Sequence, residues 1–193
     1  QFVLDELQKR GADQAEVMIT DEAGYSLEVC DGVIYRLEHQ HDVGIEITVF
    51  KNQSTANVST TDLLPSSLLL VVDKLMNLVK FTEPDPYAGL ADSSLLAFDY
   101  PDLNLYHPWS LEPTDAVQQM VACDHLLRAY DARILPAEGL SLSTYSSYHL
   151  YANTHQFMGD YSSSHHAIAC SAVVRDGDDM ETHSDSTSAC KPE

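Results

Sequence analysis

The feature that most constrains the fold is an alternation of apolar and polar residues between Ala15 and Val58. A period of two places successive apolar side chains on one face of a β-strand. Asp31-Gly32 separates two of the runs and favours a tight hairpin turn, in which both central residues need a positive φ. The pattern therefore predicts an antiparallel meander with these apolar runs: Ala15, Val17, Ile19; Tyr25, Leu27, Val29; Val33, Tyr35, Leu37; Ile45, Ile47, Val49; Ala56, Val58.

Three stretches have helical periodicity instead. A short helix is expected to end in the basic turn before Gly11, and Pro65 begins a second helix with an apolar stripe over 68–79. Leu64 stands at the N-cap of this second helix, where Ser or Asp would accept free backbone N–H groups, so the cap is predicted to be weak. The third helix is predicted from Pro113 to Ala132, with this apolar side: Ala116, Met120, Cys123, Leu127, Tyr130.

The remaining segments are less regular. Residues 82–113 contain five of the eight prolines and predict an irregular connector, packed by these side chains: Tyr87, Leu90, Phe98, Tyr100, Leu105, Tyr106, Trp109. Further strands are expected within 140–151 and 157–174, followed by a turn at Asp176-Gly177-Asp178-Asp179. The tail from Thr182 to Glu193 is polar without a core pattern, which is typical of a truncation point.

These elements predict an α+β fold. Antiparallel strand meanders carry two main helices packed on them, and the C-terminal part is rich in strands. Within residues 1–193, these elements suggest two sub-units, 1–81 and 113–182, joined by the Pro-rich connector 82–112.

Composition excludes several classes of partner. The formal net charge is −20, and the ten Lys and Arg residues are scattered along the chain. Nucleic-acid binding gains most of its affinity from Lys and Arg at phosphates, so we expect no nucleic-acid partner. No apolar run approaches the roughly 20 residues of a membrane span. We therefore expect no membrane partner.

The cysteines and the N-terminus bear on the compartment. Cys30, Cys123, Cys170 and Cys190 have no C-x-x-C spacing, so we predict free thiols in a reducing environment. No signal peptide opens the chain, although Gln1 in place of Met indicates that the native N-terminus is not included. The expected location is the cytoplasm.

The histidines are the first candidates for metal chemistry. A helical zinc peptidase motif begins with His-Glu, and none of the nine histidines is followed by Glu. His39 and His41 are two residues apart in a strand-like stretch, so they could share a metal with Glu38 or Asp42, or simply mark a polar strand end. His165 and His166 are adjacent, point to opposite faces, and are expected to be surface or cross-strand residues.

Nucleophiles and calcium ligands are equally weak candidates. Ser26 lacks the second glycine of a G-x-S-x-G elbow, because Glu28 stands there. Cys123 and Cys170 are expected in apolar packing, which leaves Cys30 as the most exposed candidate thiol. The turn at 176–179 lacks the ligand spacing of an EF-hand and favours a solvated hairpin turn. No phosphate-binding glycine motif is present. We therefore assign no catalytic, cofactor-binding or metal-binding residue from the sequence.

Several blocks together resemble a known family. Asp85-Pro86-Tyr87-Ala88-Gly89-Leu90 and Asp102-Leu103-Asn104-Leu105-Tyr106-His107-Pro108 are the most specific of them. The chain is similar to the N-terminal half of the PmbA (TldE) branch of the TldD/PmbA family, also called modulators of DNA gyrase. The similar segments follow the family order along nearly the whole chain: Gly44–Phe50, Ala56–Leu63, Phe81–Asp92, Leu96–Pro108 and Asp178–Glu181. Leu64 departs from the capping Ser usual in that family. The resemblance implies that residues 1–193 are the N-terminal domain of such a protein, and that its C-terminal domain is absent from this chain.

The resemblance implies a bacterial, cytoplasmic zinc metallopeptidase assembled as a heterodimer. In this family TldD supplies the H-E-x-x-x-H zinc motif, and the PmbA/TldE subunit lacks it. The complex is associated with proteolysis in microcin B17 maturation and antitoxin degradation. The expected partners are a TldD-like subunit and peptide or unfolded protein substrates, with zinc in the partner and no cofactor in this chain.

Two other classes of function stay open at this point. The chain could be an autonomous metal or thiol enzyme that uses His39, His41 and Cys30. It could also be an acidic module that binds a basic protein or peptide, an interaction that salt would weaken.

Overall fold

The computed structural model describes residues 1–136 and 138–192. The chain forms two compact units, and each is assembled from three separate segments. Unit 1 comprises Gln1–Asp21, Asp42–Leu103 and Tyr148–Tyr161, whereas unit 2 comprises Glu22–His41, Asn104–Ser147 and Ser162–Glu193. Four strands contribute residues to both units. The sequence-based division into sub-units 1–81 and 113–182 stays a prediction.

The α+β prediction is confirmed, and the strands are antiparallel where their registers are defined. The strand order is β3-β2-β1-β5-β6-β4, and β7 pairs with β6. Strands β1 and β2 each contain two of the predicted apolar runs. The residues between the runs also belong to the strand, because the hydrogen bonds between strands join backbone groups and do not depend on an alternation of side chains. The strands are β1 Gln14–Cys30, β2 Val33–Lys51, β3 Ser54–Thr60, β4 Ile134–Leu135, β5 Leu140–Asn153, β6 Met158–Asp176 and β7 Asp179–Ala189.

The first two hairpin turns use the left-handed backbone region at both central residues. Asp31 and Gly32 have φ values of 53° and 70°, as the Asp-Gly pattern predicts. Asn52 and Gln53 have φ values of 51° and 66°, so a second turn of this kind joins β2 and β3 without a glycine. Asn tolerates this conformation better than Gln does.

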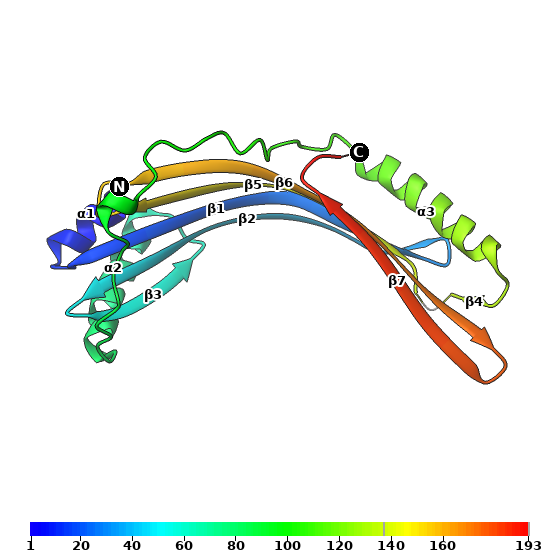
Figure 1. Cartoon of the computed structure of the whole chain (residues 1–193), viewed down its shortest axis with the longest axis horizontal. Coiled ribbons are helices and arrows are strands. Elements are labelled where there is room, and N and C mark those ends of the chain that lie inside the picture. The colour runs from blue at the N-terminus through cyan, green and yellow to red at the C-terminus, as the bar shows by residue number, and fades with distance from the viewer. Residues whose placement is uncertain (137, 193) are drawn as a thin grey trace. The chain divides into compact units, whose positions relative to one another are not determined.

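The core of unit 1 lies between the sheet and two helices, α1 Phe2–Lys9 and α2 Pro65–Leu78 (Figure 1). Helix α2 continues into the short 3₁₀ helix η1, Val79–Phe81. As predicted, the side chain of Leu64 makes no capping hydrogen bond at the start of α2. The predicted stripe is largely confirmed, and the buried residues of α2 and η1 are Leu68, Val72, Leu75, Met76 and Val79.

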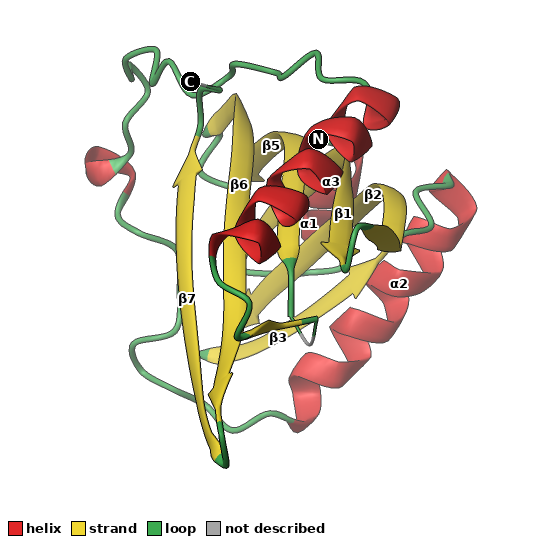
Figure 2. Ribbon diagram, turned by 90° about the vertical axis from the view of Figure 1, so that its right-hand side faces the viewer, coloured by secondary structure: helices red, strands yellow, loops and turns green. Residues whose placement is uncertain are grey.

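The core of unit 2 forms where α3, Pro113–Tyr130, covers one face of its strands (Figure 2). The helix buries Ala116, Met120 and Asp124. The prediction that Cys123 and Tyr130 lie on the packed side is wrong, because the buried stripe follows i+4 spacing toward Asp124 and both residues are exposed. The strands contribute these buried residues: Tyr25, Leu27, Val29, Leu140 and Leu142.

The connector is irregular, as predicted, apart from the 3₁₀ helix η2 at Ser93–Leu95. Its expected packing is only partly found. Leu90, Leu105 and Trp109 are half-buried, whereas Tyr87 is 93% exposed. The connector carries these other exposed side chains: Phe98, Tyr100 and Tyr106.

The polar tail, which has no core pattern in the sequence, does have regular structure. Residues 182–189 belong to β7, which pairs with β6 over eleven residues (Figure 2). All its side chains are exposed, so no apolar alternation marks this strand in the sequence. No helix in the part of the chain that the structure describes is long and apolar enough to span a membrane.

Candidate interaction surfaces

The structure does not give His39 and His41 the surroundings of a metal site. Both lie on the exposed first half of β2, and the His39 ring lies 5.6 Å from the ring of Tyr25. Among residues 1–136 and 138–192, no group of three or more His, Cys, Asp or Glu side chains is placed to hold a metal ion. The third ligand that zinc requires is therefore not supplied here.

His165 and His166 point to opposite faces, as predicted. Of the two predicted settings, His165 is exposed at the surface, whereas His166 is a buried cross-strand residue that contacts Thr144 of the neighbouring strand β5. The Nε2 of His166 lies 2.9 Å from the carbonyl oxygen of His107, to which it donates. Its Nδ1 lies 2.8 Å from the hydroxyl of Thr144, and the Trp109 ring meets its edge at 5.6 Å. Both ring nitrogens are occupied, so His166 is a structural residue.

The cysteines are ordinary thiols in their surroundings. All four are free, as predicted. Cys30 is half-buried, with Sγ 3.4 Å from the carbonyl oxygen of Glu138, so the expectation that it is the most exposed thiol is wrong and Cys123 is the exposed one. Burial raises the pKa of Cys170, which disfavours the nucleophilic thiolate.

The other motifs behave as predicted. Ser26 lies within strand β1 and not at a strand-to-helix elbow. Residues 176–179 form the hairpin turn between β6 and β7.

A buried ion pair that the sequence analysis missed holds three parts of unit 2 together. Asp124 is fully buried and accepts hydrogen bonds from Nε and Nη2 of Arg128 at 3.0 and 2.9 Å and from the Gly32 amide at 2.7 Å. Arg128 also donates to the carbonyl oxygens of Leu135 and Glu138 at 2.9 and 2.8 Å. Because these groups are engaged with one another, the pair links α3, the β1–β2 turn and the segment before β5.

The i+4 spacing of Asp124 and Arg128 is a signal that could have revealed this pair. Ala116, Met120 and Asp124 also repeat every four residues, which places the carboxylate on the buried side of α3. An acidic residue at a core position requires a charged or hydrogen-bonding partner.

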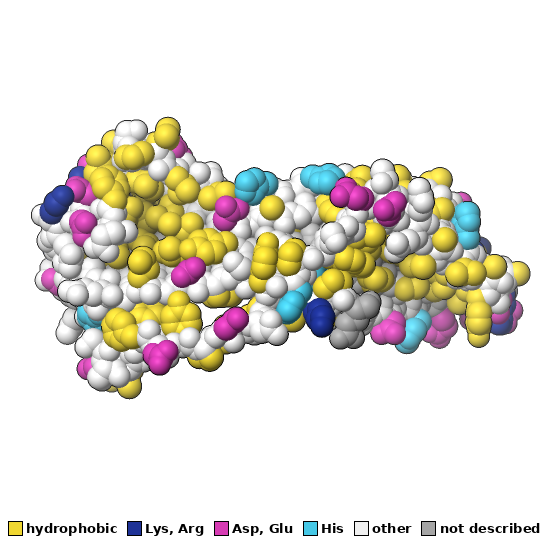
Figure 3. Space-filling view, turned by 90° about the horizontal axis from the view of Figure 1, so that it is seen from above, with side chains coloured by type: hydrophobic (Ala, Val, Ile, Leu, Met, Phe, Trp, Pro, Cys, Tyr) yellow, Lys and Arg dark blue, Asp and Glu magenta, His cyan; other side chains and the backbone are white. Residues whose placement is uncertain are grey.

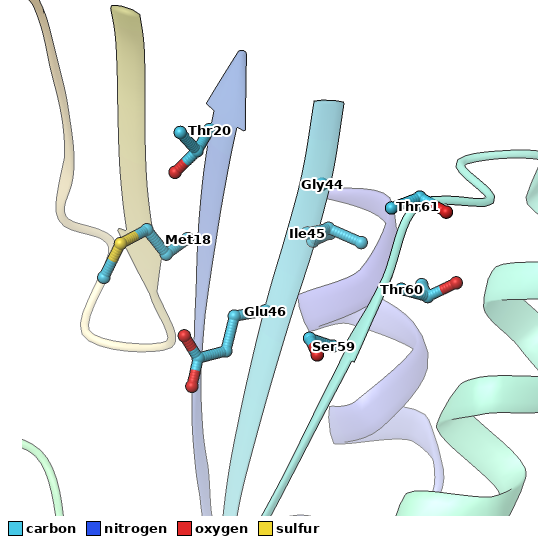
Figure 4. Close-up of a pocket in the computed structure, with 8 residues that line it drawn as sticks. All are labelled: Met18, Thr20, Gly44, Ile45, Glu46, Ser59, Thr60 and Thr61. Atoms are coloured by element: carbon cyan, nitrogen blue, oxygen red, sulfur yellow. The ribbon is translucent and has the colours of Figure 1, made fainter. Parts of the chain in front are cut away.

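A groove of about 490 Å³ lies on the open part of the sheet in unit 1 (Figure 4). Met18 and Thr20 come from β1, Glu46 comes from β2, and Ser59 and Thr61 lie at the end of β3 and just beyond it. The Glu46 carboxylate accepts a hydrogen bond from Nδ2 of Asn57 at 3.3 Å. The lining offers hydroxyl groups and one carboxylate, without a nucleophile and base in contact.

Unit 2 has an open sheet face with small side chains. A groove of about 460 Å³ on it is lined by residues that include Ser141, Ala167 and Ser186. The Arg36 guanidinium and the Glu28 carboxylate also line this groove and pair with each other at 2.5 Å. The rest of the lining combines serine and threonine hydroxyls with apolar side chains and His165, a mixture that favours contact with another polypeptide.

The described surface carries a few local ion pairs. Arg133 contacts Asp131 at 2.8 Å and Asp176 at 3.3 Å. Its hydrogen bond lowers the pKa of Asp131 to about 2.

Exposed apolar side chains occur in both units. In unit 2, Val33 and Tyr35 follow the β1–β2 turn, and Leu126 and Tyr130 lie on the outer side of α3. On the face seen in Figure 3, hydrophobic side chains form patches with Asp and Glu between them and few Lys or Arg. Large exposed apolar patches mark contact surfaces in soluble proteins. The described surface therefore fits contact with other polypeptides better than chemistry on a small molecule.

Two family models match the chain. Residues 15–79 match the PmbA/TldA metallopeptidase domain 1, and residues 106–191 match the PmbA/TldA metallopeptidase central domain.

Curated relatives match over most of this chain but less than half of their own length. The metalloprotease PmbA of Escherichia coli O157:H7 is 31% identical over 176 residues, which are 91% of this chain and 39% of that protein. The metalloprotease PmbA homolog of Haemophilus influenzae is 32% identical over 172 residues, which are 89% of this chain and 38% of that protein.

Solved structures show the same fold. A putative modulator of DNA gyrase from Bacteroides thetaiotaomicron has a TM-score of 0.90 at 21% identity, over 99% of this chain and 44% of that chain. TldE from Thermococcus kodakarensis has a TM-score of 0.75 at 13% identity, over 98% of this chain and 42% of that chain.

Proposed function

This chain belongs to the PmbA/TldD metallopeptidase family, and from that premise we propose that it is a non-catalytic part of a zinc peptidase whose active site lies on a TldD-type partner. The chain spans about 39% of the length of its E. coli relative. Its proposed task is assembly of the complex and guidance of the polypeptide substrate.

The proposal rests on which side chains of this chain could act as zinc ligands. Zinc in a peptidase requires three protein ligands and a nearby general base. No histidine of this chain is followed by glutamate, and the described residues contain no group of three possible ligands. His166 is unsuited as a ligand because both its nitrogens are hydrogen-bonded. The zinc implied by the family therefore does not fit the described residues, and no catalytic step is assigned to them.

The surfaces support a role in polypeptide contact. Apolar side chains such as Tyr35 and Leu126 are exposed, and the grooves of the two units are lined by hydroxyl groups together with apolar and a few charged side chains. Interface cores are enriched in aromatic and large apolar residues. We propose a TldD-like subunit and unfolded or peptide substrates as partners, in the bacterial cytoplasm, with microcin B17 maturation and antitoxin degradation as the associated processes.

The test is co-expression of this chain, carrying an affinity tag, with the TldD-type protein of the same organism. We expect the partner to co-purify, zinc to be stoichiometric with the partner, and hydrolysis of an unfolded polypeptide only when the partner is present. The chain purified alone is expected to contain no zinc and to cleave nothing.

The matched control is the double variant His39→Ala/His41→Ala of this chain. It should leave the zinc content and the peptidase rate of the complex unchanged, because the structure supplies no third ligand beside these histidines. Zinc bound to this chain alone, and lost in the double variant, would overturn the proposal in favour of an autonomous metal enzyme. Failure of the partner to co-purify would count against the assembly role.

A further inference from the structure

Strand β7 has one side without a neighbouring strand. It pairs with β6 from Asp176 opposite Asp179 to His166 opposite Ala189, and β6 is its single strand partner in the described sheet. Figure 2 shows it running along β6 at the border of the sheet. The side chains of all eleven residues are exposed, so no described helix or loop packs on the faces of this strand.

The hairpin turn fixes which backbone groups face outward. Gly177 and Asp178 form a two-residue loop, which makes Asp176 and Asp179 a hydrogen-bonded pair. Backbone groups then alternate in direction along the strand. The outward-facing N–H and C=O groups belong to Met180, Thr182, Ser184, Ser186 and Ser188.

A side-chain hydrogen bond agrees with this assignment of the outward-facing backbone groups. The Ser186 amide donates to the Oδ1 of its neighbour Asp185 at 2.9 Å, so this donor points away from β6. A row of outward donors and acceptors is a template for another strand.

The two faces of β7 differ in charge. Thr182, Ser184, Ser186 and Ser188 share the open face described above, whereas Asp179, Glu181 and Asp185 share the opposite face. In a two-stranded pair, opposite charges directly across from each other stabilise the pairing and like charges destabilise it. An added strand is therefore favoured if its residues opposite the carboxylates are Lys or Arg and those opposite the hydroxyls are Thr or Ser.

The same charges disfavour several registers of pairing with a second copy of this chain. In an antiparallel self-pair centred on Thr182, Asp179 would lie opposite Asp185. A parallel in-register pair would place each carboxylate against itself. Charged edge residues prevent edge-to-edge association of identical sheets while still admitting an oppositely charged strand.

We propose that the open edge of β7 binds an extended polypeptide segment with Lys or Arg at alternate positions, by strand addition to the sheet. The segment pairs with the backbone of Thr182, Ser184 and Ser186, and its basic side chains lie beside Asp179, Glu181 and Asp185. This site rests on the backbone and charges of β7 and stands independently of the proposed peptidase role.

The probe is a fluorescein-labelled peptide of about eleven residues in which Lys and Thr alternate, to match the length of β7. Binding is measured by fluorescence anisotropy. We expect saturable binding that weakens as salt rises. A peptide of the same composition with N-methylated alternate amides should bind roughly tenfold or more weakly, because it keeps the charge and loses the ladder hydrogen bonds.

Two double variants distinguish the effect on peptide affinity of charges on β7 from that of charges elsewhere in the chain. Glu181→Lys/Asp185→Lys should weaken binding roughly tenfold, although the loss of Asp185 frees the Ser186 amide. The control Glu83→Lys/Asp99→Lys makes the same change in net charge at exposed connector positions and should leave the affinity within about twofold.

Three results would overturn the proposal. They are equal binding of the N-methylated peptide, equal losses in the two double variants, or no binding of the Lys-Thr peptide. Far-UV circular dichroism shows that each variant remains folded, and the N-methylated peptide tests strand addition without any change to the protein.

Discussion

At the scale of single residues, the deciding feature of unit 2 is the buried carboxylate of Asp124. Each successive residue of an α-helix is rotated by about 100° around the helix axis. A shift of one position can therefore move a side chain from the packed side to the solvent side. Cys123 and Asp124 differ in this way, since Cys123 is exposed and Asp124 is fully buried. Hydrophobicity favours burying the cysteine, and the hydrogen bonds of Asp124 with Arg128 and Gly32 reverse that preference.

Replacement of Asp124 by Asn should lower the free energy of unfolding by about 3 kcal/mol, because Arg128 would lose its buried counter-charge. Urea unfolding followed by the fluorescence of Trp109, the single tryptophan, measures the change.

The matched control is Asp115→Asn, which removes an exposed carboxylate from the first turn of the same helix. This variant should lower the free energy of unfolding by about 0.3–1 kcal/mol, because the negative charge at the N-terminal end of the helix dipole is lost. Equal losses in the two variants would show that the buried pair does not stabilise unit 2 more than a surface charge does.

At the scale of elements, the start of α2 is a weak point that the sequence already predicts. Pro65 sets the backbone for the first turn, but Leu64 cannot accept a hydrogen bond from the free N–H groups of Ser66 and Ser67. The Leu64 side chain is 63% exposed, so it contributes little to the core.

Leu64→Ser should raise the free energy of unfolding by about 1 kcal/mol, since a serine hydroxyl at this position can accept one of these N–H groups. Thermal or urea unfolding measures the gain. Leu64→Ala is the control, because it removes the same side chain without adding an acceptor. A gain of equal size in the alanine variant would assign the effect to loss of exposed apolar surface instead of capping.

Strand β7 shows the limit of patterns at this scale. The meander of residues 15–58 was predictable because one face of each strand is buried in at least part of its length, which selects alternating apolar residues. Strand β7 buries no side chain, and its hydrogen bonds with β6 alone hold it in the sheet. Backbone pairing leaves no signature in side-chain polarity, so the polar sequence from Thr182 onward shows no core pattern although it forms a strand.

At the scale of the whole molecule, the formal net charge of −20 opposes the compact state. We expect the thermal unfolding midpoint to rise when NaCl is increased from about 0.01 M to about 0.15 M, because the Debye length falls from about 30 Å to about 8 Å. A rise of about 1 kcal/mol in the free energy of unfolding would raise the unfolding midpoint by about 2–4 °C.

The control for this salt effect is Glu83→Lys/Asp99→Lys, which lowers the magnitude of the net charge at exposed positions. Its unfolding midpoint should depend less on salt than that of the parent chain. A midpoint that is independent of NaCl in both proteins would contradict a stability limited by self-repulsion.

The sequence by itself determined the α+β class, the helix positions, the Asp31-Gly32 turn and the family, because periodicity, turn residues and specific blocks are local properties of the chain. The i+4 spacing of Asp124 and Arg128 is a local signal for the buried pair, but only the tertiary structure shows that the Gly32 amide completes it. The tertiary structure alone decided that both nitrogens of His166 are occupied, by Thr144 and His107, and that β7, without a buried side chain, extends the sheet beside β6. Hydrogen bonds between segments far apart in the sequence arise only when the chain folds, and a strand held by its backbone alone leaves no pattern in side-chain polarity.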